Sequence, residues 1–530
     1  MTVAKRKPLS FSTTMRNPAR ITGFLDCLLP FENQILTSSL ISRIIKSVLN
    51  KKLYETMYQK RHPEFHARFN DDEYLYSEKE LEEIIANAPQ KHKEAGFNYG
   101  WDSRFDTWYK LSKEFGFIYY EMEKPLRISS TGHMLIDAYG EIPPNVEKIQ
   151  SVFLNAMIKY QSDNPFRRNL NSNVPLVLLL NVLTLLKQDK EENGAGLFRQ
   201  ELSMLICWPD DDAQKLYQEI KKLRKSVAYN YSDEYMYELC LKILHATPKQ
   251  RRYYKMQKIC GEAVDEYIRK MRSTGIISLR GHGRFIDMNM LEIKKIQYIL
   301  NNYTTYKKFS SCLQYYEYMG DVDPYLISIE NEPEFDTSDI RKKTLYRYAE
   351  EYPSETIFKE LRKVCKKQES SDDVLKFISA PTRMEFLTSI ALVQQFKGLD
   401  VNPNYSVDDE GLPVFTAGGG VADIVCYDSD YDSFFEVTLM CGRQEQVNNE
   451  MLPIRRHLKE YRDTQPDTFS VFVAPIVHED TREIALWYKH RDDLDILVYD
   501  VDDFIAQISV CEKVSQLLTS RKNVTTKVTD

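Results

Sequence analysis

With 530 residues, a formal net charge of −7 and 42% hydrophobic residues, the chain is too long for one ordinary core and too apolar to be disordered. The acidic balance excludes a nucleic-acid coat protein that is basic throughout, but it allows a local basic face. The nine cysteines are scattered singly with no CxxC pair, which excludes a zinc ribbon or a disulfide framework and fits a reducing compartment.

The start of the chain and its longest apolar run indicate neither export nor a membrane. Residues 1–7 are basic, but no apolar stretch follows them, so we expect no secretory signal. The apolar run over 174–186 contains a proline and polar residues, and it is too short to span a bilayer. We therefore expect a cytoplasmic protein with no membrane partner, a buried helix over this run, and a second helix over 197–207 that packs against it.

Residues 1–22 form a basic arm in which hydroxyl side chains alternate with basic ones. Lys5, Arg16 and Arg20 are the candidates for contact with DNA phosphates in this arm. A solvated arm explains the same composition equally well.

A pattern of helix, glycine, short hairpin and helix occurs twice, over 107–138 with Gly116 and over 264–300 with Gly275. This order is typical of a winged-helix unit, which places one helix in a DNA groove and a hairpin on the backbone. A generic α+β packing module is the alternative. Four arginines in or beside the two units favour DNA: Arg104, Arg127, Arg280 and Arg284.

These patterns predict a mainly helical DNA-recognition region over 1–300, with winged-helix-like α+β units near 104–140 and 262–300. The aromatic-rich stretch 301–370 predicts a helical linker. Within the first region, residues 249–255 interleave basic and aromatic side chains, and there a solvated helix face is favoured over a phosphate contact.

Residues 371–530 alternate strands and helices, which predicts an α/β domain. Its centre holds two predicted strands, 421–428 and 434–440, with Asp423 and Glu436 among apolar neighbours. A buried acid is costly unless a cation or a donor meets it. Because neither segment contains Lys or Arg, the pair indicates a divalent metal held by oxygen ligands. The glycine run 418–420 predicts a close backbone approach beside Asp423.

A third acid, Glu385, lies in a predicted helix that starts near Ala380. A helix carboxylate, a strand aspartate and a glutamate 13 positions later (436 − 423) form the layout of the PD-(D/E)XK nuclease fold. The alternatives are an exposed first-turn glutamate at 385 and strand-end acids that meet helix N-termini.

Several segments then resemble one family, the AlwI-type restriction endonucleases, which include related nicking enzymes. They are residues 10–18, 385–387, 422–424, 436–438 and 450–457. The resemblance spans most of the chain. It implies a type IIS enzyme, in which an N-terminal domain reads a short asymmetric DNA sequence and a C-terminal PD-(D/E)XK-type nuclease domain cuts at a set distance to one side.

By this resemblance the catalytic acids are Glu385, Asp423, Glu436 and Glu450. We expect Asp423, Glu436 and the backbone carbonyl of Val437 to hold Mg²⁺, because that ion prefers hard oxygen ligands. Two positions after Glu436, where the broader nuclease pattern has lysine, this chain has Thr438. The group that orients the attacking water therefore stays open among Glu450, Thr438, Arg443 and a second metal ion.

The expected partner is double-stranded DNA, with a transient homodimer or a second subunit if both strands are cut. The alternatives are a nicking endonuclease, a repair or transposition nuclease on the same fold, and a DNA-binding regulator with a silent nuclease domain. The recognised bases and the cut offset cannot be derived from the sequence, because readout depends on which few side chains reach the base edges.

Overall fold

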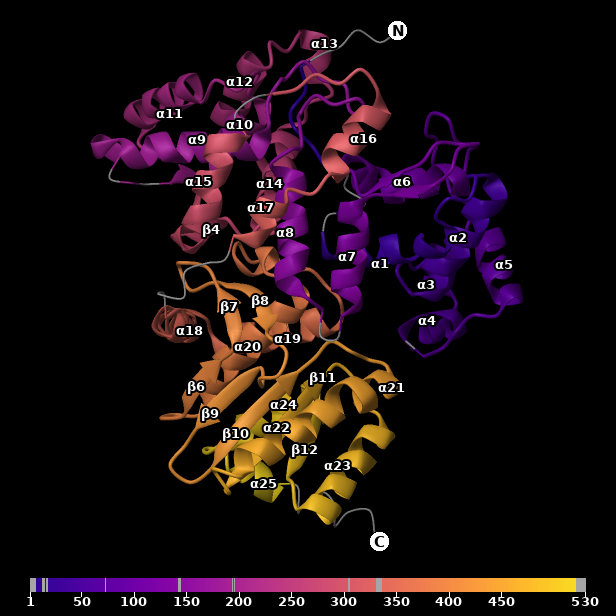
Figure 1. The fold of residues 1–530 in the computed structure, drawn as a ribbon. Coiled ribbons are helices and arrows are strands. Elements are labelled where there is room, and N and C mark those ends of the chain that lie inside the picture. The colour runs from indigo at the N-terminus through magenta and orange to yellow at the C-terminus, as the bar shows by residue number, and fades with distance from the viewer. Residues whose placement is uncertain are drawn as a thin grey trace. The chain divides into compact units, whose positions relative to one another are not determined.

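The computed structural model describes residues 6–11, 15, 18–71, 73–141, 144–192, 194, 196–303, 306–329 and 336–520 (Figure 1). The chain divides into two compact units. Unit 1 comprises Met1–His66 and Tyr76–Glu332, and unit 2 comprises Ala67–Leu75 and Pro333–Asp530. Within the described ranges, no helix combines the length and the apolar character needed to cross a membrane.

The first part of unit 1 is a group of helices with one small hairpin. Its helices are α1 (Ala19–Asp26), α2 (Ser38–Asn50), α3 (Met57–Arg61), α4 (Pro63–Asn70), α5 (Glu78–Asn87), α6 (Trp101–Glu114), α7 (Ser130–Gly140) and α8 (Val146–Met157). Strands β1 (Ile118–Tyr119) and β2 (Arg127–Ile128) form the antiparallel hairpin between α6 and α7.

The second part of unit 1 adds a three-stranded sheet to a larger set of helices. Its elements are α9 (Pro175–Gln188), β3 (Leu197–Phe198), α10 (Leu202–Cys207), α11 (Ala213–Val227), α12 (Asp233–Ile243), α13 (Pro248–Arg251), the π-helix η5 (Gln257–Glu262), α14 (Ala263–Arg272), β4 (Ile277–Arg280), β5 (Phe285–Met288), α15 (Ile293–Asn302), α16 (Cys312–Gly320) and α17 (Pro324–Ser328). The strand order is β3-β5-β4, and all pairs are antiparallel.

Both expected hairpins are present, and each follows a glycine that its backbone requires. Gly116 and Gly275 have φ of 74° and 77°, in the left-handed region that favours glycine. A Cβ at Gly116 would lie 2.3 Å from the Cβ of Met319, and one at Gly275 would lie 1.2 Å from the side-chain nitrogen of Gln150. No larger residue fits at Gly116, where backbone atoms of Met319 and Gly320 also lie within 3 Å, whereas at Gly275 the Gln150 side chain could move and the positive φ is what favours glycine.

The sequence pattern missed β3 and extended one helix across it. Residues 197–207 were expected to be helical, but Leu197 pairs with Ile286 and the helix α10 begins only at Leu202. Gly196 allows this pairing, because a Cβ there would lie 2.4 Å from the carbonyl oxygen of Ile286. A strand of two residues has no readable period, which is why the pattern did not reveal it.

Unit 2 is an α/β assembly around one five-stranded sheet. Its elements are α18 (Ser338–Glu351), α19 (Ser354–Cys365), α20 (Ala380–Gln395), β6 (Asp400–Pro403), β7 (Tyr405–Val407), β8 (Pro413–Ala417), β9 (Ile424–Tyr427), β10 (Asp432–Val437), α21 (Arg443–Glu445), the π-helix η8 (Gln446–Met451), α22 (Leu452–Arg462), β11 (Thr468–Ala474), α23 (Glu479–Asp492), β12 (Ile496–Asp500), α24 (Val501–Val510) and α25 (Gln516–Ser520).

The sheet runs in the order β12-β11-β10-β9-β6. Strands β10, β11 and β12 are parallel, whereas β9 is antiparallel to both β10 and β6. Strand β11 is buried along its whole length, as expected of a central strand with helices on both faces. The mixed helical and sheet architecture expected for the chain is confirmed, although β6, β7 and β8 were not anticipated.

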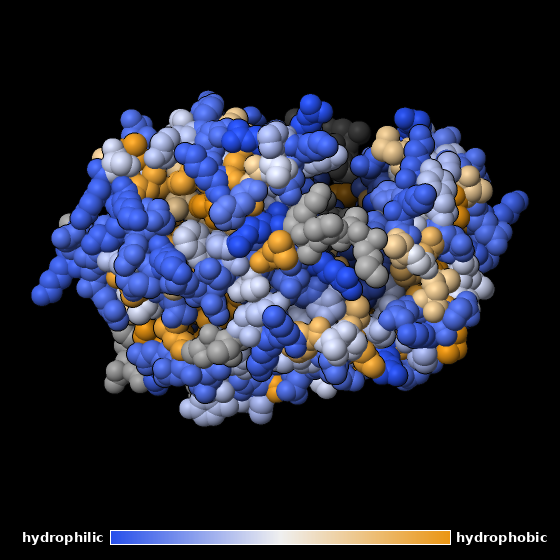
Figure 2. Space-filling view, turned by 90° about the horizontal axis from the view of Figure 1, so that it is seen from above, coloured by the Kyte–Doolittle hydropathy of each residue, from blue (hydrophilic) through white to orange (hydrophobic). Residues whose placement is uncertain are grey.

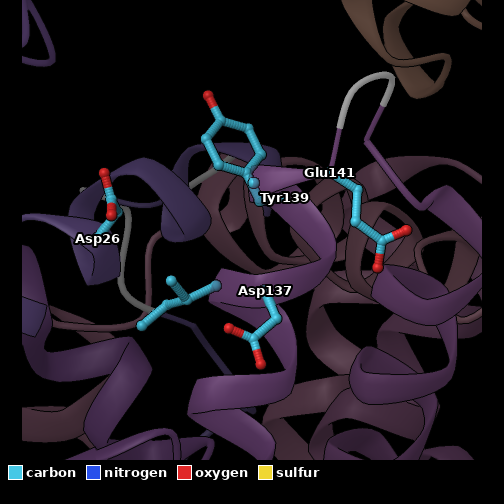
Figure 3. A pocket seen from close by; sticks show the side chains of 6 residues that line it. Asp26, Asp137, Tyr139 and Glu141 are labelled. Atoms are coloured by element: carbon cyan, nitrogen blue, oxygen red, sulfur yellow. The ribbon is translucent and has the colours of Figure 1, made fainter.

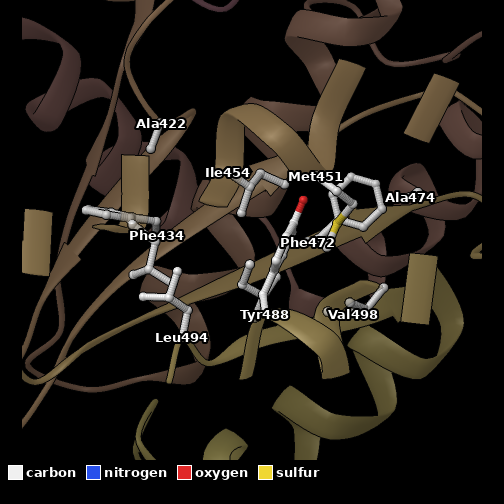
Figure 4. Packing of buried hydrophobic residues seen from close by; sticks show 12 residues of the cluster. Ala422, Phe434, Met451, Ile454, Phe472, Ala474, Tyr488, Leu494 and Val498 are labelled. Atoms are coloured by element: carbon white, nitrogen blue, oxygen red, sulfur yellow. The ribbon is translucent and has the colours of Figure 1, made fainter. Parts of the chain in front are cut away.

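The side chains of β10 alternate between two cores. Phe434 lies in a cluster with Met451, Ile454 and Phe472, beneath α22 and α23 (Figure 4). The ring of the next residue, Phe435, lies 6.2 Å from that of Phe504 on α24, on the opposite face of the sheet. Because a strand has a period of two, Glu436 faces the α22 side together with Phe434.

Candidate active site

The antiparallel pairing of β9 with β10 brings Asp423 and Glu436 together. Phe435 is opposite Ile424, so the next residues on the two segments are Glu436 and Asp423, which immediately precedes β9. The N–H of Asp423 donates to Oε2 of Glu436 at 3.3 Å, and the N–H of Val437 donates to Oδ2 of Asp423 at 2.8 Å. The two carboxyl groups therefore share one end of the strand pair.

Helix α20 contributes Glu385 from a buried position. Its side chain is 3% exposed, and Oε2 accepts a hydrogen bond from the N–H of Ala417 at 3.0 Å. The helix starts at Ala380 with Pro381 in its first turn, as expected. The alternative of an exposed first-turn glutamate is wrong, because Glu385 is the sixth residue of the helix and is enclosed.

Glu450 reaches the same region from the π-helix η8, which lies between α21 and α22. Its carboxylate is hydrogen-bonded by the side chain of Thr438, the residue directly after β10. The neighbouring Met451 is fully buried and anchors this wide turn in the core. Single turns of π-helix are rare and are often found at functional sites.

His457 on α22 is a further member of the site that the sequence analysis did not assign. Its Nδ1 lies 3.4 Å from Oε1 of Glu436, while its Nε2 is buried without a hydrogen-bond partner in the described part of the chain. Burial lowers the pKa of His457, and the nearby charge of Arg456 lowers it further. Only the fold reveals this residue, because a single sequence gives no direct signal for its contact with Glu436.

Burial raises the pKa of all four acids, and repulsion from neighbouring carboxylates adds to this effect for Glu385, Asp423 and Glu436. Burial first, and then the charge of Asp423, hold the pKa of Glu385 well above its ordinary value. The pKa of Asp423 is raised well above its ordinary value by burial and by Glu436. Burial, with the charge of Glu450, raises the pKa of Glu436 to about 8, and burial raises that of Glu450 to about 7.

No Lys or Arg within the described ranges forms an ion pair with any of the four acids. The cluster therefore combines closely placed carboxylates with a local shortage of positive charge. Arg443, one candidate for orienting water, instead lies 3.4 Å from Glu73 and 3.5 Å from Asp480. A divalent cation is the chemical group that such an all-oxygen set accepts best.

Asp423, Glu436 and the backbone carbonyl of Val437 are the groups that we expect to hold Mg²⁺. Among the described residues, no three or more His, Cys, Asp and Glu side chains already stand in positions to hold one ion. The hydrogen bonds of Asp423 and Glu436 to backbone N–H groups occupy part of their acceptor capacity. The donor chemistry nevertheless fits Mg²⁺, because carboxylate oxygens are its preferred protein ligands.

The glycine run before Asp423 leaves its backbone open. A Cβ at Gly418 or Gly420 would meet no heavy atom of the described protein within 4 Å. Gly420, in the turn into β9, has a φ of 90°, which only glycine adopts without strain. The expected approach of a phosphate or a metal ion to this backbone stays a prediction.

The predicted DNA contacts in unit 1 fall into different environments. Arg127 on β2 and Arg284 in the β4–β5 turn are exposed. Arg127 has no hydrogen bond or ion pair within the described ranges, whereas Arg284 donates from Nε to the carbonyl of Gly281 at 3.0 Å. Arg20 on α1 is exposed and donates to the carbonyl of Leu53 at 2.7 Å. Lys5 and Arg16 lie outside the described residues.

Two other predicted contacts are engaged inside the fold. The guanidinium of Arg104 lies 4.7 Å from the ring of Tyr54 and 5.5 Å from that of Trp108, and it bonds His92 at 2.7 Å. Arg280 pairs with Asp287 across the β4–β5 hairpin at 2.8 Å. These contacts give both arginines a packing role.

A cavity of about 510 Å³ in unit 1 is separate from the four acids (Figure 3). Its lining residues are Asp26, Ile136, Asp137, Tyr139, Gly140 and Glu141. The three acids make it unsuitable for a phosphate, and Asp26 is already paired with Lys51. The candidate active site is therefore the acidic cluster at the strand end of unit 2, whose carboxylates have no Lys or Arg partner among the described residues.

Comparisons with known proteins agree with a nuclease. The family model described as AlwI restriction endonuclease matches residues 113–334 and 321–506. A search of curated proteins gives no match. Among solved structures, the small subunit of the heterodimeric restriction endonuclease R.BspD6I aligns with 21% identity and a TM-score of 0.25, over 29% of this chain and 76% of that one.

Restriction endonuclease FokI aligns with 13% identity and a TM-score of 0.25 over 96% of each chain. FokI bound to DNA aligns with 10% identity and a TM-score of 0.24 over 97% of each chain. TM-scores this low do not establish a shared fold. The family match, by contrast, covers most of the sequence and includes all four acids.

A restriction endonuclease is thus the class of protein that the sequence match and the acidic site define. The chain belongs to the AlwI restriction endonuclease family.

Proposed function

We propose that this enzyme is a type IIS restriction endonuclease that binds a short asymmetric DNA site and hydrolyses phosphodiester bonds outside it. The supporting observation is the convergence of Glu385, Asp423, Glu436 and Glu450, which have raised pKa values and no Lys or Arg partner among the residues that the structure describes. This arrangement suits a reaction in which negative charge on a phosphate must be neutralised by a bound cation.

Asp423 and Glu436, with the carbonyl of Val437, would hold Mg²⁺. When bound, this ion would neutralise phosphate charge and lower the pKa of a water molecule that attacks phosphorus. Glu385 and Glu450 would hold water around the scissile phosphate through their carboxylates. His457 would keep the Glu436 carboxylate in place through its contact at 3.4 Å, and Thr438 would do the same for Glu450.

The element order supports a PD-(D/E)XK assignment for residues 371–530. Helix α20 is followed by the antiparallel strands β6, β9 and β10, then by α22 and the parallel strand β11. In this assignment the four acids gather near the end of β10. Residues 301–370 remain the proposed linker, of which α18 and α19 belong to unit 2.

The order of elements also supports a winged-helix-like second unit. Helix α9, strand β3, helices α10 and α14, and the hairpin β4–β5 occur in this order, with α11, α12, α13 and η5 between α10 and α14, and β3 completes the sheet. In this assignment the β4–β5 hairpin is the wing that contacts the DNA backbone, whereas α14 is enclosed in the unit, since eight of its ten residues are buried. The hairpin β1–β2 plays the corresponding part in the first unit, and residues 1–300 form the recognition region.

Run-off sequencing of a randomised plasmid library incubated with Mg²⁺ tests the proposed function. We expect cuts at a fixed distance to one side of one asymmetric sequence. Cuts in one strand alone would identify a nicking enzyme, and cuts in both would require a second copy or subunit. Cleavage that follows DNA junctions instead of sequence would contradict the proposal, and so would site-specific binding without cleavage.

The two environments of the predicted DNA contacts lead to opposite expectations for single substitutions. Arg127→Gln should weaken DNA binding several-fold and leave the melting temperature unchanged, because its exposed guanidinium has no partner in the described part of the fold. Arg104→Gln should lower the melting temperature by a few degrees, because it loses two ring contacts and a hydrogen bond. Fluorescence anisotropy and thermal unfolding of both variants would measure this contrast. Equal effects on binding and stability in both variants would refute it.

A further inference from the structure

One segment of unit 1 is far more basic than the rest of the chain. Residues 239–261 contain six Lys and Arg and no Asp or Glu, in a protein whose net charge is −7. The six residues are Lys242, Lys249, Arg251, Arg252, Lys255 and Lys258, and all are exposed. Only Arg251 has an ion-pair partner within the described ranges, since it bonds both oxygens of Glu238 at 3.1 Å.

Helix α11 of the same unit shows how a basic cluster is normally neutralised. Its four lysines each contact an acid. The pairs are Lys215–Asp212 at 2.8 Å, Lys221–Asp189 at 2.5 Å, Lys222–Glu219 at 2.5 Å and Lys225–Glu191 at 3.3 Å. A solvated helix face therefore describes α11 well. The segment at 249–258 differs, because only Arg251 among its five basic residues pairs with an acid of the described chain.

The backbone that carries these charges is held in place. Thr247 and Gln250 form a capping box at the start of α13, with the N–H of Thr247 donating to Oε1 of Gln250 at 2.7 Å. The hydroxyl of Tyr254 donates to the carbonyl of Arg6 at 2.7 Å, and Ile259 is fully buried. The neighbouring Tyr253 points outward and is 78% exposed. An ordered backbone that presents unpaired cations and a phenol reduces the entropic cost of binding an anionic surface.

The segment leads directly into η5 and α14, the helix that precedes the β4–β5 hairpin. The face of the molecule shown in Figure 2 is the end at which α13 is drawn in Figure 1, and it is mostly hydrophilic with scattered apolar residues. A surface of this character does not suit an apolar protein partner. It suits the sugar-phosphate backbone, whose contacts come mainly from Lys, Arg and hydroxyl groups.

We propose that Lys249, Arg252, Lys255 and Lys258, together with Tyr253, bind backbone phosphates of duplex DNA beside the recognised bases. This inference rests on the proposed function, in which residues 1–300 form the DNA-recognition region. We call these five residues the phosphate clamp. Because it contacts phosphates, the clamp fixes the position of the protein on DNA and does not distinguish sequences.

A pair of matched variants of the full chain tests the clamp. The clamp variant replaces Lys249, Arg252, Lys255 and Lys258 with Gln, and the control variant replaces the four paired lysines of α11 with Gln, so both remove four positive charges from unit 1. Binding to a mixed-sequence duplex is measured by fluorescence anisotropy over about 50 to 300 mM KCl without divalent metal. The clamp variant should lose about three to four units of the slope of log affinity against log salt, and about tenfold or more in affinity at low salt. The control should change that slope by less than about one unit.

Equal slopes in the clamp variant and the wild type, or equal losses in both variants, would overturn the clamp. If the clamp variant has a lowered melting temperature, the double variant Arg252→Gln/Lys258→Gln replaces it, with an expected slope loss of about two units. If the wild type binds and cuts DNA but the clamp variant has the same salt slope as the wild type, only the clamp is refuted. A wild-type protein that does not bind DNA refutes the proposed function.

Discussion

Asp423→Ala should reduce the single-turnover rate of DNA cleavage in Mg²⁺ by about a thousandfold or more, equivalent to roughly 4 kcal/mol of barrier. Asp423 is the residue whose carboxylate lies beside Glu436 and bonds the N–H of Val437 at 2.8 Å. Its removal would take away one of the two side chains that we assign to the metal. DNA affinity should remain within about twofold, because the proposed recognition surfaces lie in unit 1.

Two further variants separate loss of charge from loss of folding. Asp423→Asn keeps a side-chain oxygen that can accept a hydrogen bond from the N–H of Val437. A similar loss of cleavage in this variant would therefore come from the loss of the negative charge. Asp430→Ala is the matched control, since Asp430 is an exposed acid in the loop between β9 and β10 and pairs with Lys513 at the surface. Wild-type cleavage by Asp423→Ala would show that the active-site assignment is wrong.

The stability of the metal-free protein should fall as pH rises, and Mg²⁺ should restore it. The pKa of Glu436 is raised from 4.5 to about 8 and that of Glu450 from 4.5 to about 7, so the folded state holds protons that the unfolded chain has released. Folding is therefore favoured most below about pH 4.5, and this contribution is lost as pH rises through 7 and 8. At pH 8, Mg²⁺ should raise the melting temperature by about 5 °C or more, with little effect near pH 5.

Glu436→Gln provides the control for this pH dependence. The amide carries no charge at any pH, so the metal-free variant should be more stable than the wild type at pH 8, and Mg²⁺ should stabilise it much less. Thermal unfolding of both proteins from pH 5 to 8, at matched ionic strength, measures the difference. A wild-type melting temperature that neither falls with pH nor responds to Mg²⁺ would contradict the charge imbalance that we infer.

The part of the site that depends on local pattern could be predicted from the sequence. Asp423 and Glu436 lie on two apolar segments joined by a short turn, and an antiparallel pair of such strands places them side by side. Glu385 was found through the helix start at Ala380 and the family resemblance. His457 was missed because its role comes from a tertiary contact with Glu436, for which a single sequence carries no direct signal.

The features that depend on distant partners could not be predicted. Arg104 and Arg280 looked like DNA contacts by residue type, but the rings of Tyr54 and Trp108 and the carboxylate of Asp287 engage them within the fold. Strands β3 and β6 are too short, or too polar, to show a period of two. Conversely, the segment at 249–255 looked like an ordinary solvated face. It differs from α11 because, among its basic residues, only Arg251 forms an ion pair in the described structure.

The π-helix η8 has a consequence for how the acidic cluster tolerates change. A turn of this kind contains one residue more than a regular turn, so the residues before it are rotated relative to those after it. Here the following helix is fixed by Ile454 and Leu458 in the core, while Glu450 sits within the wide turn. Deleting a single residue between 446 and 449 would allow a regular helix to form. Either the hydrogen bond between Glu450 and Thr438 or the packing of the following helix on the sheet would then be lost. The number of residues in this short stretch is therefore more tightly constrained by geometry than its polar composition suggests.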